Sequence, residues 1–193
     1  PPGQRSVSYS TYPPKDFDAW GEFIGKVARE RAMVKQAGLF PTQKYNYYEI
    51  HWEPCGHYKG TDDDFMRMYE VAWKAIHDND PGGRLLGPVS SMPGISRPMR
   101  LFEERLGPLG PDNRHVDGVS YHANAAWPDR SMRAETRRLV AGARRYLKPG
   151  AKIVMTEVGT RDVEDWPRHP APLRAQMANN LRMHLITLGE GVD

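Results

Sequence analysis

The sequence predicts an α/β protein in which parallel strands alternate with helices, as in one part of a (β/α)8 barrel. Four apolar, β-rich segments begin at residues 47, 84, 116 and 151, and helix-period segments lie between them. Units of this kind join parallel strands by right-handed crossovers. A complete barrel needs eight strands and about 250 residues, whereas this sequence has 193 residues and four such strands. We therefore expect residues 1–193 to be part of a single barrel domain, completed by flanking strands outside this sequence or by a second copy.

The four predicted strands have nearly continuous apolar residues, which is typical of strands that are buried on both faces. A strictly alternating pattern would instead indicate a sheet with one face in water. The predicted strands span residues 47–52, 84–89, 116–122 and 151–158.

Helices are predicted wherever apolar residues recur every three or four positions. The clearest one begins at the N-cap Thr61, and Asp62 to Asp64 suit the positive end of its dipole. Its apolar face comprises Phe65, Met68, Tyr69, Ala72, Trp73 and Ile76. Other helices are expected at about 16–36 and 99–106, at 132–147 before Pro149-Gly150, and at 173–188 before Gly189. In the last of these, the predicted buried stripe is Leu173, Met177, Leu181, His184 or Leu185, and Leu188.

Composition limits the class of protein. Hydrophobic residues make up 39% and charged residues 26%, which is typical of a globular chain, and no apolar run approaches the roughly 18 residues of a membrane span. The net charge is only +3, and the densest basic residues share one helix, so we expect a solvated helix face and no nucleic-acid partner. The lone Cys55 cannot make an internal disulfide, so cysteine usage does not fix the compartment. The location we favour is extracellular or periplasmic.

Chemistry in parallel α/β folds is placed at the carboxyl ends of the strands. Two of the four predicted ends here carry a carboxylate, Glu53 and Glu157. A carboxylate that closes an apolar strand is costly to bury unless it is paired or used. Two such groups facing each other suit glycoside hydrolysis, in which one donates a proton to the leaving oxygen and the other attacks or activates water.

The segments that carry these residues resemble clan A glycoside hydrolases. "YYEIHWEP" is similar to the strand-4 acid/base motif of that clan, "VDGVSYHAN" to strand 6 and "KIVMTEVG" to the strand-7 nucleophile motif. The flanking segments are similar to family thirty-nine, which contains β-xylosidases and α-L-iduronidases, and to related exopolysaccharide hydrolases. The resemblance implies a retaining enzyme that acts without a cofactor on a polysaccharide or oligosaccharide. It assigns Glu53 as acid/base and Glu157 as nucleophile, with carboxyl groups about 5–5.5 Å apart.

Further residues are candidates for substrate binding. Trp52 stands where the clan usually has the Asn that binds the sugar 2-hydroxyl, and His51 stands where Trp is usual. An indole donates but does not accept hydrogen bonds, so this contact differs from the clan pattern. His122 is either a partner of the nucleophile or sugar, or a buried structural histidine. The other candidates are Tyr121, which points either to the site or into the barrel wall, and Trp127 and Trp166, which either stack on sugar or anchor loops.

Two other functional classes remain open on these residues. The change at Trp52 is compatible with a carbohydrate-binding barrel that has lost catalysis. The short chain is compatible with a flavodoxin-like doubly wound sheet, which would have no facing carboxylates. We expect no metal site, because His51, Cys55 and His57 match no zinc spacing and lack an evident fourth ligand.

Overall fold

A computed structural model describes residues 12–39, 44–51, 58–88, 90–91, 97–106, 113–124, 128–159 and 170–192. The elements alternate along the chain as the sequence predicts, and every strand pair is parallel. Their order is α1 (Phe17–Gln36), β1 (Tyr47–Tyr48), α2 (Asp62–Asn79), β2 (Arg84–Leu85), β3 (Ser90–Ser91), α3 (Arg97–Leu106), β4 (Gly118–Asn124), α4 (Pro128–Tyr146), β5 (Lys152–Gly159) and α5 (Pro170–Gly189).

The strands follow one another in sequence order across the structure. β1 pairs with β2, β3 pairs with β4, and β4 pairs with β5. A bridge between Leu86 and Gly118 joins the end of β2 to the start of β4, so β2 and β3 both lie next to β4. Among the described strands the order never reverses, whereas a doubly wound sheet has a reversal where its ligand binds. The described strands form a two-stranded and a three-stranded parallel sheet, and these sheets do not form a closed barrel.

Among the described residues of the predicted strand over 84–89, only Arg84–Leu85 forms a strand, β2, and a separate short strand, β3, follows at Ser90–Ser91. Gly87 and Pro88 lie between β2 and β3, and Pro88 has no amide hydrogen to donate to a ladder. The predicted first strand is also shorter than expected, since β1 covers only Tyr47–Tyr48. The two later strands agree with the prediction to within two residues at each end.

Helix α2 forms as its sequence predicts. The Thr61 hydroxyl accepts from the Asp64 amide at 3.0 Å, and the Asp64 carboxylate accepts in return from the Thr61 amide at 3.1 Å. This capping box satisfies amide groups that the first turn otherwise leaves without partners. The buried face of the helix comprises Phe65, Met68, Tyr69, Ala72 and Ile76, with Trp73 only partly buried.

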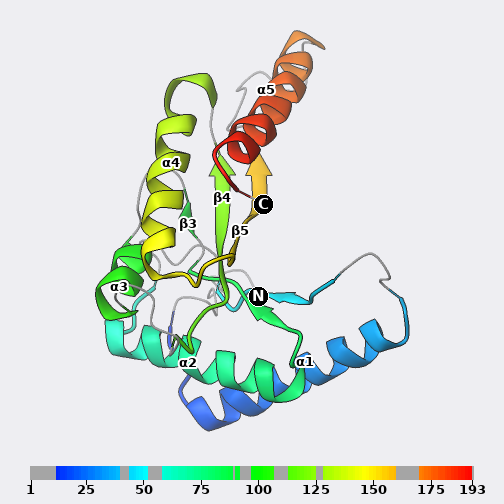
Figure 1. Ribbon diagram of the computed structural model, residues 1–193, viewed down its shortest axis with the longest axis vertical. Coiled ribbons are helices and arrows are strands. Elements are labelled where there is room, and N and C mark those ends of the chain that lie inside the picture. The colour runs from blue at the N-terminus through cyan, green and yellow to red at the C-terminus, as the bar shows by residue number, and fades with distance from the viewer. Residues whose placement is uncertain are drawn as a thin grey trace, which may run out of the picture.

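The helices form two groups relative to β4 and β5. Figure 1 shows α1 and α2 side by side near the amino ends of β4 and β5, with α4 and α5 running beside the strands. The predicted stripe of α4 is confirmed, since Met132, Thr136, Leu139 and Ala143 are all buried. Among the described helices, none is both long and apolar enough to cross a membrane.

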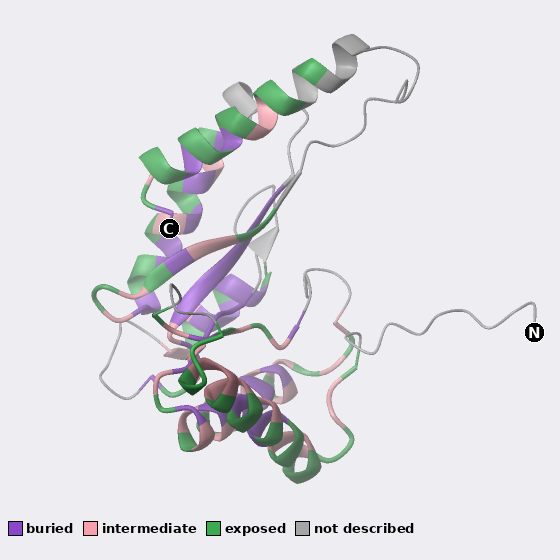
Figure 2. Ribbon diagram, turned by 90° about the vertical axis from the view of Figure 1, so that its right-hand side faces the viewer, coloured by how far each residue is buried: buried purple, intermediate pink, exposed green. Residues whose placement is uncertain are grey.

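The predicted buried stripe of α5 is wrong. Met177, Leu181, Leu185 and Leu188 are 61–65% exposed, and Figure 2 shows this outward face of the helix that ends at the point marked C. The buried side of α5 includes Met183, Ile186 and Thr187, and the helix packs against α4 and β5. The helix has apolar residues on both sides, so periodicity alone does not select the side that meets the sheet.

Candidate active site

A histidine and a glutamate meet at the carboxyl ends of β4 and β5. Nδ1 of His122 lies 3.8 Å from Oε2 of Glu157, which is ion-pair distance when the imidazole is protonated. The His122 side chain is 3% exposed and that of Glu157 is 44% exposed. A buried ring therefore lies beside a carboxylate that is itself partly exposed.

A register shift between β4 and β5 produces this contact. Tyr121 pairs with Met155, but the next residue, His122, pairs with Glu157, so Thr156 is an extra residue in β5. Without the shift, His122 would pair with Thr156. Glu157 would then face the same side of the sheet as Met155, which is the side covered by helices. β-Bulges are frequent beside active sites, where they redirect a side chain. Here the bulge brings the carboxylate to the side of His122.

Thr156 connects the end of β5 to the end of β1. Its hydroxyl donates a 2.8 Å hydrogen bond to the carboxylate of Glu49, which directly follows β1. Sequence reasoning did not select either residue. A signal was present, because Glu49, His51 and Glu53 are polar at alternate positions of an otherwise apolar segment.

Tyr121 points away from His122. Its side chain is 1% exposed, and its hydroxyl is 3.3 Å from that of Thr136 on α4. Burial raises the pKa of Tyr121 to about 12. The structure therefore places Tyr121 in the wall between the sheet and α4, which is the second of the two positions considered for it, and it does not line the site.

His51 lies in an aromatic cluster beside the start of α2. It is 4% exposed, and its ring centroid is 5.6 Å from that of Tyr58 and 6.1 Å from that of Phe65, both in edge-on geometry. Such packing fixes the chain at the end of β1, immediately before Trp52 and Glu53. The predictions for Trp52, Glu53, Trp127 and Trp166, like the remarks on Cys55 and His57, fall outside the described residues.

Several basic side chains of α4 are paired with carboxylates of neighbouring elements. The basic face of α4 is exposed, and Arg137 pairs with Glu190 at 2.6 Å while Arg145 pairs with Glu103. Across the described part of the chain, no group of three or more His, Cys, Asp or Glu side chains could hold a metal ion.

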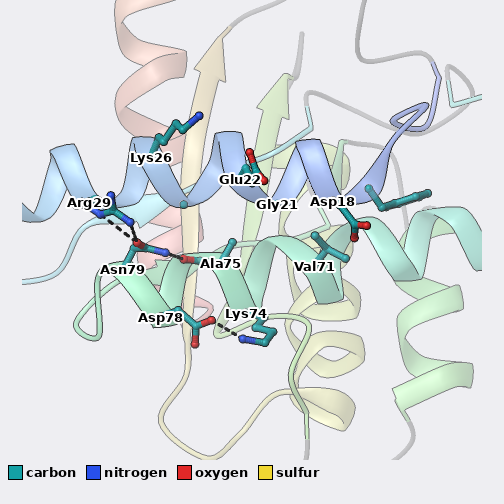
Figure 3. Close-up of a pocket in the computed structure, with 12 residues that line it drawn as sticks. Asp18, Gly21, Glu22, Lys26, Arg29, Val71, Lys74, Ala75, Asp78 and Asn79 are labelled. Carbon is teal, nitrogen blue, oxygen red and sulfur yellow. Dashed lines mark hydrogen bonds and ion pairs between the residues drawn. The ribbon is translucent and has the colours of Figure 1, made fainter.

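A groove of about 440 Å³ lies between α1 and α2. Figure 3 shows its charged side chains, in which Arg29 donates to the Asn79 side chain at 2.8 Å and Lys74 pairs with Asp78. The groove contains none of the strand-end residues, so it is separate from the site formed by His122 and Glu157.

The fold is similar to that of known proteins. The sequence matches no protein-family model and no curated protein. The structure is similar to a glucosidase from Croceicoccus marinus, with a TM-score of 0.54 and 15% identity. It is also similar to a monomeric β-xylosidase from Caulobacter crescentus, with a TM-score of 0.52 and 17% identity. Each similarity covers 77% of this chain, which spans about a third (32%) of the length of each glycosidase. The chain thus has the mixed helix–strand fold of part of these two enzymes.

Proposed function

We propose that this protein is a retaining glycoside hydrolase that cleaves O-glycosidic bonds of a polysaccharide or oligosaccharide. In this proposal the described strands are consecutive strands of a (β/α)8 catalytic barrel. The observation that carries the proposal is the geometry of Glu157, an accessible carboxylate held beside buried His122 at a strand end by a bulge. The fold similarity to a glucosidase and a β-xylosidase supports it further.

The hydrogen bond between Thr156 and Glu49 supports a curved sheet. β1 and β5 are the outermost of four neighbouring strand positions, and neighbouring strands are about 4.8 Å apart, so a flat sheet would separate them by about 14 Å. Two short side chains meet at 2.8 Å across that interval only if the sheet curls. Curling turns the carboxyl end of β1 toward Glu157. Because Glu53 is four residues beyond Glu49, this curvature favours one site shared by both glutamates.

Each residue then has a defined role. An oxygen of Glu157 attacks the anomeric carbon while the glycosidic C–O bond breaks, and Glu53 donates its proton to the leaving oxygen. Deprotonated Glu53 next removes a proton from water, which attacks the same carbon and breaks its bond to Glu157. His122 is a positioning residue that contacts Oε2, so that Oε1 faces the sugar. Trp52, Trp127 and Trp166 are candidates to stack on sugar rings.

Azide rescue in a pair of variants tests these assignments. The full polypeptide is first screened with aryl glycosides and polysaccharides for release of aglycone or reducing ends. Glu157→Gly should lower turnover by several orders of magnitude, and azide should restore it, giving a glycosyl azide of inverted anomeric configuration. In Glu53→Ala, azide instead attacks the glycosyl-enzyme and gives the retained configuration. NMR of the azide products distinguishes the two outcomes.

Glu104→Gln, an exposed change on α3, is the matched control and should keep full turnover. Full activity in Glu157→Gly with unchanged circular dichroism would refute the mechanism. The Trp52 substitution favours a second candidate, a carbohydrate-binding barrel without catalysis. That candidate predicts saccharide binding that survives both glutamate changes and no release of reducing ends from the wild-type protein.

A further inference from the structure

A second cavity lies at the opposite end of the strands from Glu157. It has a volume of about 710 Å³ and is lined by residues at the amino ends of β2, β4 and β5, including Arg84, Asp117 and Lys152. Lys152 and Glu157 are five residues apart on β5, which corresponds to about 17 Å at the rise of a strand. The cavity is therefore distinct from the proposed active site.

Four cationic side chains from three segments of the chain line this cavity. They are Lys44, Arg84, Lys148 and Lys152, and among the described residues that line the cavity the only carboxylate is Asp117. That carboxylate is engaged from within the protein. Oδ2 accepts from the Leu85 amide at 2.9 Å and lies 3.3 Å from Nε2 of His77, while Oδ1 accepts from the Trp73 indole at 3.2 Å. Both carboxylate oxygens of Asp117 thus bind groups of the protein itself. With four cationic side chains and one carboxylate, the lining has a net positive charge.

Aromatic rings hold the cationic groups in place. The Arg84 guanidinium lies 4.6 Å from the centroid of the Tyr45 ring, and Nζ of Lys44 lies 5.1 Å from the same centroid. Nζ of Lys148 lies 5.9 Å from the centroid of Trp73, which is itself stacked on His77 at 3.9 Å. Cations placed over rings in this way are ordered before a ligand arrives, which lowers the entropic cost of binding.

The positive potential of the cavity also acts on Tyr45. The pKa of its phenol is lowered, chiefly by the hydrogen bond with Lys44 and by the charge of that lysine, with a smaller effect of Arg84. The same charges that favour a phenolate favour any other anion at this place. A concave site of this volume is in the range of small-molecule sites, whereas nucleic acids usually bind to extended basic faces.

We propose that this amino-end cavity binds a small polyanion, with two or more phosphate or carboxylate groups held by Lys44, Arg84, Lys148 and Lys152. The flat faces of Tyr45 and Trp73 allow such a ligand to carry a planar group as well. The site is independent of the proposed glycosidase activity.

Isothermal titration calorimetry with sodium tripolyphosphate tests the proposal on the full chain. The charge reversals Lys44→Glu and Lys148→Glu should each weaken binding by about tenfold or more, and added salt should weaken wild-type binding. Lys26→Glu, on α1 outside this cavity, is the matched control and should leave the affinity within about twofold. Glu157→Gln should also bind normally, which separates this proposal from that of catalysis.

Two further arms identify the class of anion. Citrate that binds more tightly than tripolyphosphate indicates a polycarboxylate, and a nucleoside triphosphate that binds more tightly than tripolyphosphate indicates use of the aromatic faces. If a charge-reversed variant does not fold by circular dichroism, the neutral variants Lys44→Gln and Lys148→Gln provide the same comparison. The proposal is overturned if none of the three probes binds at a concentration of about 1 mM, which is on the order of typical metabolite levels. It is also overturned if Lys26→Glu weakens binding as much as the cavity variants do.

Discussion

Nδ1 of His122 lies 3.8 Å from Oε2 of Glu157, and the bulge at Thr156 is what allows the two side chains to meet. A buried ring beside an accessible carboxylate is an arrangement that orients the carboxylate without blocking it. Because the ring is held by the sheet, its removal should affect the orientation of Glu157 more than the stability of the fold.

His122→Asn should lower kcat on the order of 10²-fold, with a smaller change in KM, because a misplaced nucleophile slows chemistry more than it weakens binding. Steady-state kinetics on the best glycoside of the screen measures both.

The adjacent Tyr121→Phe is the matched control for that change. It removes a buried hydroxyl that lies 3.3 Å from Thr136 on the other side of the strand. Its expected cost is about 0.5–1.5 kcal/mol of unfolding free energy, with kcat unchanged. Equal losses of kcat in His122→Asn and Tyr121→Phe would argue against a positioning role of His122.

The contact between Thr156 and Glu49 predicts energetic coupling between the ends of β5 and β1. Thr156→Val, Glu49→Met and the double variant form a double-mutant cycle, measured by urea unfolding. We expect a coupling energy of about 0.5 kcal/mol, at the low end for a hydrogen bond because both groups are exposed. Strictly additive effects of the two changes would contradict the curvature on which a shared active site depends.

The His77–Asp117 pair predicts a pH window of stability. Burial disfavours the charged form of His77, but the hydrogen bond with Asp117 and the charge of Asp117 outweigh it, so the pKa of His77 is raised above 6.5. The contribution of protonated His77 to the free energy of unfolding is complete below pH 6.5 and is lost as the pH rises through the raised pKa of His77. Burial likewise opposes ionisation of Asp117, but hydrogen bonds from His77 and from the Leu85 amide lower its pKa below 3.8. That contribution is present above pH 3.8 and is lost as the pH falls through the lowered value.

The difference in melting temperature between the wild type and Asp117→Asn should therefore be largest between pH 3.8 and 6.5 and should shrink on both sides. Asp78→Asn is the control, since it removes an exposed carboxylate paired with Lys74, and it should give a small difference. A difference for Asp117→Asn that stays constant from acid to alkaline pH would contradict this assignment.

β4 and β5 approach so closely at Gly118 that a side chain at this position would collide with its neighbours. A Cβ at this position would lie 2.5 Å from the backbone oxygen of Lys152 and 2.9 Å from Cδ2 of Leu86, so Gly118→Ala must push the strands apart. We expect a loss of about 1–3 kcal/mol in unfolding free energy. In the control Gly189→Ala no atom lies within 4 Å of the added methyl group, and the change should be neutral or stabilising by up to about 1 kcal/mol. Similar effects of the two changes on urea unfolding would contradict this packing.

The elements of this protein are largely determined by local sequence. The capping residues Thr61 and Asp64 and the apolar spacing that follows them are sufficient to predict α2, because both signals act within one or two helical turns. The alternation of apolar strands with helices predicts a parallel α/β fold for the same reason. The position of Glu157 near the end of an apolar strand also follows from the sequence alone.

Tertiary structure decided which sides these elements present. Strand alternation places Tyr121 and His122 on opposite faces of the sheet. Only the tertiary structure shows that Tyr121 packs against α4 and that His122 lies beside Glu157. The bulge at Thr156 depends on how β4 and β5 pair, although the partners Tyr121 and Met155 are far apart in the sequence. The buried face of α5 depends on which of its two apolar sides packs against the rest of the protein. The amino-end cavity brings Lys44 and Arg84 together with Lys148 and Lys152, so that three distant segments of the chain meet there. Local periodicity carries no information about such meetings, because register and packing are set by partners far away in the chain.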